Sequence, residues 1–301
     1  MNEPEKSRVR PAPKSSTVLV TGITGKQGGH VAQHLLARGH RVRGMVRDPT
    51  SSKLGTLRSQ GVEILKGSFG DPLAMEKAAR GVDAMFLMST SFEGGPEAET
   101  RQANAAIDAA KAAGVPWLVY SSVGDADRKT GIPHFDSKYA VEEYLEGSGV
   151  PHAVSAPTSF MENYLIPFQI ASIQQGKLGL ALSPDHLLQQ VALDDLGAFV
   201  VHLLENPTRF RGKRINVASD ALTGRDAARI LSDVLGKKVE FQQVPIAALR
   251  SQSADYAKMF EWLERAGYTA DIEGLRRDYP EVGWHRFREW AARQNWTPAK
   301  T

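Results

Sequence analysis

Three equally spaced glycines, Gly22, Gly25 and Gly28, lie between a short apolar run at residues 17–20 and an amphipathic stretch that ends near Gly39. The run predicts a buried parallel strand, and the stretch predicts a helix. At such a turn the first glycine permits a tight bend, the second lets backbone N–H groups approach a pyrophosphate, and the third allows helix and strand to pack closely. The helix N-terminus adds unpaired donors and a partial positive charge. The pattern therefore indicates phosphate binding, and the alternative is an ordinary glycine-rich turn.

A basic residue stands where a dinucleotide-binding sheet holds the adenosine ribose. Arg47 follows the predicted second strand, residues 41–46, where an NAD-selective fold carries Asp or Glu. A guanidinium suits a 2′-phosphate because it forms paired, charge-assisted hydrogen bonds, and Lys53 is placed to complete this site. NADP(H) is therefore the expected cofactor. NAD(H) is the less favoured alternative, since a strand that ended one residue later would bring Asp48 to the ribose.

His134 and Lys138 are the candidate catalytic pair. They lie four residues apart, so they share one face of a helix. The spacing resembles the Tyr-x-x-x-Lys pair of short-chain dehydrogenases, with histidine in the place of tyrosine. Lys138 is expected to hold the nicotinamide ribose and to lower the pKa of a nearby proton donor, and His134 to donate a proton near neutral pH. The alternatives are a solvent-exposed helix lysine and a histidine that merely begins a helix.

Alternating strands and helices must position these side chains. Apolar runs predict further strands at residues 62–66, 83–88, 117–120 and 152–156, and the stretches between them predict helices at 53–60, 72–80, 96–113 and 135–146. Such alternation is typical of a Rossmann-type α/β fold, a doubly wound parallel sheet with right-handed crossovers. Ligands of such sheets bind outside the carboxyl ends of the strands.

The second half of the chain alternates less regularly. It predicts a helix at 160–174, a strand at 178–182, a helix at 194–205 with an aspartate cap, a strand at 214–217, a helix at 221–235, a strand at 239–244 and a largely helical remainder. We expect a smaller C-terminal α/β substrate lobe over the carboxyl ends of the sheet. The expected division is a disordered tail at 1–16, an NAD(P)-binding domain at 17–157 and mainly the substrate lobe at 158–301, with later segments returning to the first domain.

Composition excludes several classes of protein. The 301 residues contain no cysteine, which rules out disulfides, thiolate catalysis and cysteine-ligated metals. No apolar run reaches the length of a membrane span, and the N-terminus lacks a signal-peptide core, so a cytoplasmic protein is expected. Most of the net charge of +3 lies within residues 1–14, so no nucleic-acid surface is expected. No metal site is expected either, because His30, His34 and His40 lack a matching carboxylate motif.

Several longer segments resemble one protein family. They are residues 20–29 around the glycines, 46–49, 120–123, 134–138 with 142–145, and 159–163, followed in the second half by 195–199 and 267–272. Together these segments resemble the NmrA-like family, whose members are atypical short-chain dehydrogenase/reductase proteins. The resemblance extends from residue 17 to the end of the chain.

The resemblance implies a Rossmann domain and a small lobe with NADP(H) in the cleft between them. It assigns the pyrophosphate to the glycine loop, the 2′-phosphate to Arg47 and the nicotinamide ribose to Lys138. The whole implied cofactor site comprises Gly22, Ile23, Thr24, Gly25, Lys26, Gln27, Gly28, Arg47, Lys53, Ser68, Phe69, Ser89, Thr90, Ser91, Lys138, Phe160, Met161, Glu162 and Asn163. Two positions depart from the family pattern: Ser68 replaces an aspartate that can meet adenine, and Ala156 replaces an arginine near the site.

The family contains both NAD(P)H-dependent reductases and non-catalytic dinucleotide sensors. The apolar and aromatic segment 157–164 favours a reductase that transfers hydride from NADPH to a small apolar acceptor, such as a quinone, an enone or a carbonyl. The usual catalytic tyrosine is missing, so protonation falls to His134, Lys138 or solvent. The alternative is a redox sensor that regulates a protein partner, and an epimerase or lyase is less favoured because of Arg47. A monomer or homodimer without membrane partners is expected.

Overall fold

Seven parallel strands form the central sheet, in the order β10-β6-β5-β4-β1-β2-β3. The computed structural model describes residues 15–297. The strands are β1 (Thr17–Val20), β2 (Arg41–Val46), β3 (Glu63–Lys66), β4 (Ala84–Met88), β5 (Leu118–Ser121), β6 (His152–Pro157) and β10 (Arg214–Val217). The order reverses between β1 and β4, which is where doubly wound sheets bind their ligands. The predicted doubly wound fold is confirmed.

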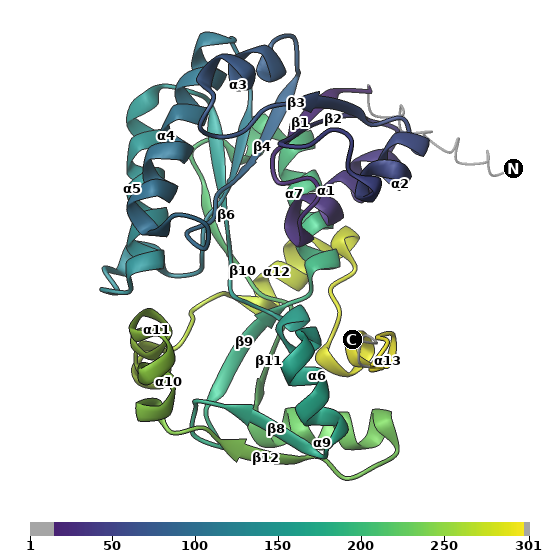
Figure 1. The fold of residues 1–301 in the computed structure, drawn as a ribbon, viewed down its shortest axis with the longest axis vertical. Helices are drawn as coiled ribbons and strands as arrows, with labels where there is room; N and C mark the ends of the chain where they lie inside the picture. The colour runs from purple at the N-terminus through teal and green to yellow at the C-terminus, as the bar shows by residue number, and fades with distance from the viewer. Residues whose placement is uncertain (1–14, 298–301) are drawn as a thin grey trace, which may run out of the picture.

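Helices cover both faces of this sheet (Figure 1). One face carries α3 (Pro72–Ala79), α4 (Gly95–Ala112) and α5 (Pro133–Ser148), and the other carries α1 (Lys26–Ala37) and α7 (Leu193–Glu205). The short helices α2 (Gly55–Ser59) and α8 (Pro207–Phe210) contribute Leu57 and Phe210 to the core on the second face. Strand β1 shows why both faces must be covered. Its Leu19 packs with the first group, while its Val18 and Val20 pack with the second. Side chains of successive residues point to opposite faces, so an apolar run needs two helix layers.

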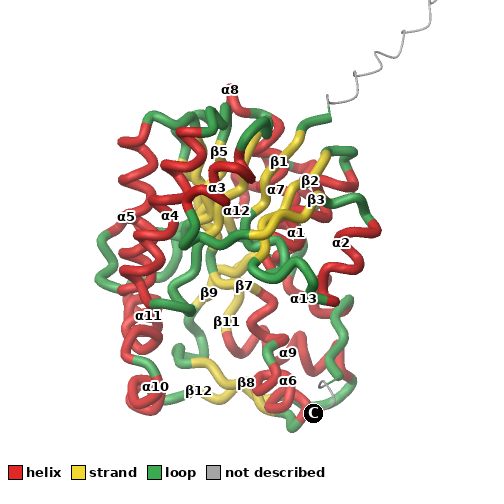
Figure 2. Tube along the Cα trace, turned by 45° about the horizontal axis from the view of Figure 1, so that its top comes forward, coloured by secondary structure: helices red, strands yellow, loops and turns green. Residues whose placement is uncertain are grey.

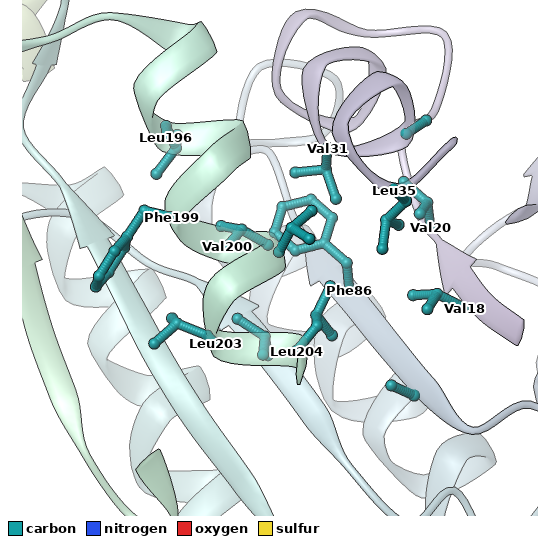
Figure 3. Packing of buried hydrophobic residues seen from close by; sticks show 14 of the residues in the cluster. Val18, Val20, Val31, Leu35, Phe86, Leu196, Phe199, Val200, Leu203 and Leu204 are labelled. Atoms are coloured by element: carbon teal, nitrogen blue, oxygen red, sulfur yellow. The ribbon is translucent and has the colours of Figure 1, made fainter. Parts of the chain in front are cut away.

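The core between α1, α7 and the sheet joins distant parts of the chain. Figure 3 shows Val31 of α1, Phe86 of β4 and Val200 of α7 within one cluster, and all three are fully buried. The two helices approach closely at Gly197, where an added Cβ would lie 2.9 Å from the His34 side chain. Helix α7 therefore belongs to the sheet, although it follows the first strands of the lobe in sequence.

The lobe lies beyond the carboxyl ends of the sheet (Figures 1 and 2). It contains a three-stranded sheet, β11-β9-β7, and a two-stranded sheet, β12-β8. Its strands are β7 (Ser159–Phe160), β8 (Lys177–Leu180), β9 (Leu187–Val191), β11 (Asp220–Thr223) and β12 (Glu240–Gln243), and its helices are α6 (Pro167–Gln174), α9 (Gly224–Leu235), α10 (Ile246–Gln252), α11 (Ala254–Arg265) and α13 (Phe287–Ala292). Helix α12 (Ile272–Asp278) instead contributes Leu275 to the core between the large sheet and α7. In residues 15–297, no helix is long and apolar enough to cross a membrane.

Two predicted helices in the lobe were wrong in their first residues. The stretch 160–174 begins as strand and 3₁₀ helix, and the α-helix starts only at Pro167, whose ring favours the first helical position. The stretch 221–235 begins as strand β11, because the Thr223 side chain accepts a hydrogen bond from Asp226 N and so begins helix α9 at the next residue.

Other details also differ from the prediction. Strand β9 was missed, because its sequence Leu-Leu-Gln-Gln-Val does not alternate. Asp194 does not cap α7: Ala192 occupies the N-cap position, and Asp194 lies in the first turn. The tail prediction falls mainly on residues 1–14, outside the described residues. Ser15 and Ser16, however, are held to the turn before β2, since Ser15 Oγ donates to Gly39 O at 2.9 Å and Ser16 N to His40 Nδ1 at 3.2 Å.

The two adjacent glycines of α1 make a matched stability test. A Cβ on Gly28 would lie 2.4 Å from the carbonyl oxygen of Gly22, whereas a Cβ on Gly29 would lie 3.6 Å from Ile23 O, an ordinary contact. We therefore expect Gly28→Ala to lower the free energy of unfolding by about 1–3 kcal/mol through overpacking. Gly29→Ala should raise it by up to ~1 kcal/mol through helix propensity. Urea denaturation followed by circular dichroism measures both, and equal effects of the two substitutions would contradict this packing.

Candidate functional site

The glycine loop presents the start of α1 at the carboxyl end of β1. Gly22 has a φ of +61°, in the left-handed region, and Gly25 N donates to Gly22 O at 2.8 Å, which closes the turn. Gly25 is the N-cap of α1 and supplies no side-chain cap. The N–H groups of Lys26, Gln27 and Gly28 occupy the first helical turn, where helix geometry provides no acceptor. This arrangement suits an anion that bridges the turn.

The side chains of the loop have separate roles. Ile23 is buried and packs against Gly44, where an added Cβ would lie 2.8 Å from its side chain. It therefore can meet a ligand only through its backbone, whereas Thr24 is exposed. The Gln27 side chain is held by β5, because Ser121 Oγ donates to Gln27 Oε1 at 2.7 Å. The first turn of α1 is thus fixed to β5.

Arg47 forms a two-point ion pair with Glu93, a residue that was not among the predicted site residues. Its Nη1 and Nη2 each donate to one carboxylate oxygen at 3.0 Å. The two side chains are 73% and 61% exposed. Asp48, the alternative ribose ligand, is used within its own turn, since Thr50 N and Thr50 Oγ1 donate to it at 2.8 and 2.6 Å and lower its pKa. Both side chains thus have partners within the protein, and the preference for Arg47 over Asp48 at the ribose stays a prediction.

The remaining adenosine-side residues lie in the segments that follow β2 and β3. Lys53 belongs to the short 3₁₀ helix Ser52–Leu54. Ser68 and Phe69 follow β3, and the Phe69 ring is partly buried against the core formed by α3 and α4. Ser68 O accepts a hydrogen bond from Asp71 N at 3.1 Å, which orders the turn before α3.

Lys138 lies in a buried polar cluster at the carboxyl end of β4. Its Nζ lies 2.8 Å from Glu99 Oε1 and 3.0 Å from Ser89 O. Glu99 is completely buried and accepts further hydrogen bonds from Ser89 Oγ at 2.9 Å and Ser137 Oγ at 2.7 Å. Lys138 is therefore not a solvated helix lysine. The Glu99 carboxylate balances the charge of Lys138. The position of Lys138 beside Ser89 depends on the end of β4, on α4 and on α5.

Sequence reasoning missed Glu99, although a signal was present. Glu99 shares the buried face of α4 with Ala103, Ala106 and Ala110, and a lone carboxylate on an alanine face needs a partner. The hydroxyl of Tyr120 lies 3.1 Å from Ser89 Oγ in the same cluster. Burial raises the pKa of Tyr120 well above its ordinary value, and the residue is inaccessible to solvent, so it does not replace the missing catalytic tyrosine.

The loop after β4 continues from this cluster toward the lobe. Ser91 O accepts from Gly95 N at 2.8 Å, and Thr90 Oγ1 accepts from Phe92 N at 3.3 Å, so both residues shape the turn before α4. The Phe92 ring is 78% exposed, and its centroid lies 6.5 Å from that of Tyr256 on α11. A stacked aromatic pair thus joins the loop after β4 to α11 of the lobe.

His134 and Lys138 contact different partners. His134 Nδ1 lies 2.5 Å from Asp255 Oδ2 of α11. Burial lowers the pKa of His134 more than Asp255 raises it, so the imidazole is neutral at pH 7. A neutral imidazole is a weak proton donor. The structure gives His134 a contact between α5 and the lobe, and its role as a proton donor stays a prediction.

The segment 160–163 is mostly structural. Met161 is fully buried in the lobe core, and the Glu162 carboxylate accepts hydrogen bonds from Leu193 N at 3.2 and 3.1 Å and from Trp290 Nε1 at 2.9 Å. Burial raises the pKa of Glu162. Phe160 is partly buried against the sheet core and Asn163 is exposed. Tyr164 packs under Phe287 and Trp290, so the aromatic character of this stretch serves the lobe core rather than a pocket wall.

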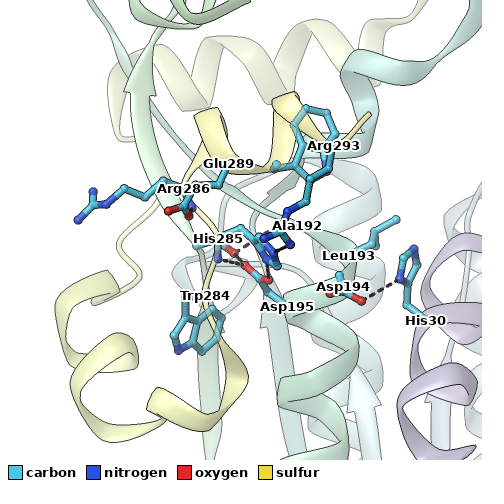
Figure 4. A network of polar contacts seen from close by, with 12 residues as sticks. His30, Ala192, Leu193, Asp194, Asp195, Trp284, His285, Arg286, Glu289 and Arg293 are labelled. Carbon is cyan, nitrogen blue, oxygen red and sulfur yellow. Dashed lines mark hydrogen bonds and ion pairs between the residues drawn. The ribbon is translucent and has the colours of Figure 1, made fainter. Parts of the chain in front are cut away.

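Acidic and imidazole groups gather at the start of α7 (Figure 4). Asp194 Oδ1 lies 2.8 Å from His34 Nε2 and 3.8 Å from His30 Nδ1, so a carboxylate that sequence reasoning overlooked stands beside these histidines. Asp194, Asp195 and His285 each offer a ligand atom within 4.8 Å of the others. However, both oxygens of Asp195 already accept hydrogen bonds, from Ser219 Oγ at 2.5 Å and from His285. The absence of a metal site stays a prediction.

The neutral state of buried His134 predicts a pH dependence of stability. Its pKa in the native state lies below the ordinary value of 6.5, so the unfolded chain binds more protons as the pH falls below that value. The free energy of unfolding should therefore decrease on acidification, and His134→Gln should make this decrease shallower. Urea titrations from pH 8 to 5 test this, with pH 8 as the internal reference because both states are neutral there. Parallel curves for the variant and the wild type would contradict a neutral native His134.

Known proteins resemble this chain in sequence and fold. The NmrA-like family matches residues 14–291. A (4-alkanoyl-5-oxo-2,5-dihydrofuran-3-yl)methyl phosphate reductase of Streptomyces griseus is 34% identical over 238 residues, 78% of this chain and 79% of the relative. The structure of an NADPH-dependent quinone oxidoreductase of Escherichia coli with NADPH is 25% identical, with a TM-score of 0.76 over 91% of this chain and 98% of that one. NmrA, a negative transcriptional regulator, has the same fold, with 21% identity and a TM-score of 0.77 over 93% and 95%. This chain belongs to the NmrA-like family.

Proposed function

We propose that this chain is an NADPH-dependent oxidoreductase that reduces a small apolar acceptor, such as a quinone, an enone or a carbonyl. One observation carries the proposal: an uncapped helix N-terminus and a solvent-exposed guanidinium lie at the carboxyl ends of adjacent strands, β1 and β2. Together they suit the pyrophosphate and the 2′-phosphate of one cofactor. The reductase from Streptomyces griseus and the quinone oxidoreductase from Escherichia coli support the reaction class.

The residues present fit this cofactor. The glycines of the turn leave no room for side chains. A Cβ added to Gly22 would lie 2.6 Å from Met88 Sδ, and one added to Gly25 would lie 3.1 Å from Gly22 O. The backbone itself therefore forms the binding surface. A bound reduced nicotinamide would supply hydride to the acceptor. Lys138, beside Ser89, would hold the nicotinamide ribose. With His134 neutral, protons for the reduced acceptor come from Lys138 or from water.

The aromatic pair supports an apolar acceptor. Phe92 and Tyr256 are exposed by 78% and 38% and stack with their ring centroids 6.5 Å apart, between the loop after β4 and α11. Exposed aromatic rings offer a flat acceptor the stacking surface that segment 160–164 does not provide. A quinone tolerates the missing tyrosine best, because water can protonate its reduced oxygens.

The first test concerns the cofactor. Arg47→Ala should weaken NADPH binding roughly 10- to 100-fold, the loss of a charged two-point hydrogen bond, and should leave NADH binding nearly unchanged. Fluorescence titration of both cofactors measures this. Arg80→Ala is the control, because Arg80 is also exposed, by 70%, and also pairs with a glutamate. Equal losses for NADPH and NADH would contradict the assignment of Arg47 to the 2′-phosphate.

The second test concerns turnover, measured as NADPH oxidation with quinones and carbonyls. Lys138→Met alone leaves Glu99 buried without its cation, which should cost about 3–5 kcal/mol of stability as well as activity. The double variant Lys138→Met, Glu99→Gln removes both charges and should recover most of the stability while remaining inactive. Wild-type kcat in the double variant would show that Lys138 has no catalytic role. Tight cofactor binding without turnover of any acceptor by the wild type would favour the sensor instead.

A further inference from the structure

The ion pair between Arg47 and Glu93 spans the place where the strand order reverses. Arg47 directly follows β2, and Glu93 lies in the loop between β4 and α4. Strand β1 lies between β2 and β4 in the sheet, so the pair reaches across the end of β1 and its glycine loop. The adenosine half of a dinucleotide must lie at this position. The pair therefore stands at the adenosine end of the cleft.

The carboxylate of Glu93 presents to Arg47 what a phosphate would present. Two oxygens accept from Nη1 and Nη2 at 3.0 Å each, which is the planar two-point geometry by which a guanidinium binds either a carboxylate or a phosphate. A 2′-phosphate cannot take both nitrogens while Glu93 holds them. Even at the edge of the guanidinium, its negative charge would lie close to that of the carboxylate.

We infer that Glu93 competes with the 2′-phosphate for Arg47 and so weakens the preference for NADPH over NADH. The inference rests on the proposed function, in which Arg47 binds the 2′-phosphate. NADPH must displace Glu93, whereas NADH carries no group that needs the two nitrogens. Glu93 thus lowers the affinity for NADPH and not that for NADH. The ratio of the two affinities is therefore smaller than it would be if Arg47 had no carboxylate partner.

The test is a set of cofactor titrations on the full chain with Glu93→Gln. Removing an exposed ion pair should tighten NADPH binding about two- to fivefold, with NADH unchanged. The same gain should appear with 2′,5′-ADP, which carries the 2′-phosphate but no nicotinamide, and not with 5′-AMP. Glu97→Gln is the matched control, since Glu97 is 94% exposed and pairs with Arg101 rather than with Arg47. In an Arg47→Ala background, Glu93→Gln should give a smaller gain, because the competition for Arg47 is gone and only the repulsion between the carboxylate and the 2′-phosphate remains.

The outcomes separate this inference from the proposed function. If Arg47→Ala selectively weakens NADPH binding but Glu93→Gln leaves it unchanged, the competition is wrong and the cofactor site stands. An equal gain for NADPH and NADH, or the same gain with Glu97→Gln, likewise overturns the competition. If the wild type binds neither cofactor, the proposed function fails, and the competition fails with it.

Discussion

The close contact between α1 and the glycine loop is the constraint on which the rest of the site depends. A Cβ at Gly28 would come within 2.4 Å of the Gly22 carbonyl oxygen, so the helix lies directly against the turn that precedes it. This contact directs the first-turn N–H groups over the end of β1. It also sets the position of α1 against α7, where Gly197 allows a similarly close approach. A side chain at Gly28 or Gly197 would push α1 away from its neighbour and so move the anion site relative to β2 and β4.

Buried carboxylates then connect the elements around the cleft. Glu99 joins α4, α5 and the end of β4 through Lys138 and two serine hydroxyls. Glu162 joins the segment after β7 to the start of α7 and to α13. Each carboxylate is costly to bury and becomes tolerable only when all its partners are in place. Buried carboxylates of this kind stabilise the one arrangement of helices and strands in which all their hydrogen bonds form. The site is therefore organised before any ligand arrives.

The sequence predicted what depends on neighbours along the chain. The glycine turn, the strands up to 152–156 and the return strand at 214–217 follow from local apolar patterns and turn residues. Partners brought together by the fold were not predictable: Lys138 and Glu99 are 39 residues apart, Arg47 and Glu93 are 46 apart, and His134 and Asp255 are 121 apart. The same limit explains Glu162, Met161 and Tyr164, whose aromatic and acidic pattern resembles a pocket wall but serves a core.

The order of elements has a consequence for how the chain is made on the ribosome. Strand β10 forms the outer edge of the sheet, and helix α7 covers α1. Both are translated after β7, β8 and β9 of the lobe. The apolar face formed by Val18, Val31 and Phe86 therefore stays uncovered until residues beyond 200 have left the exit tunnel. The core of the large sheet is therefore completed only after β7, β8 and β9 of the lobe have been made.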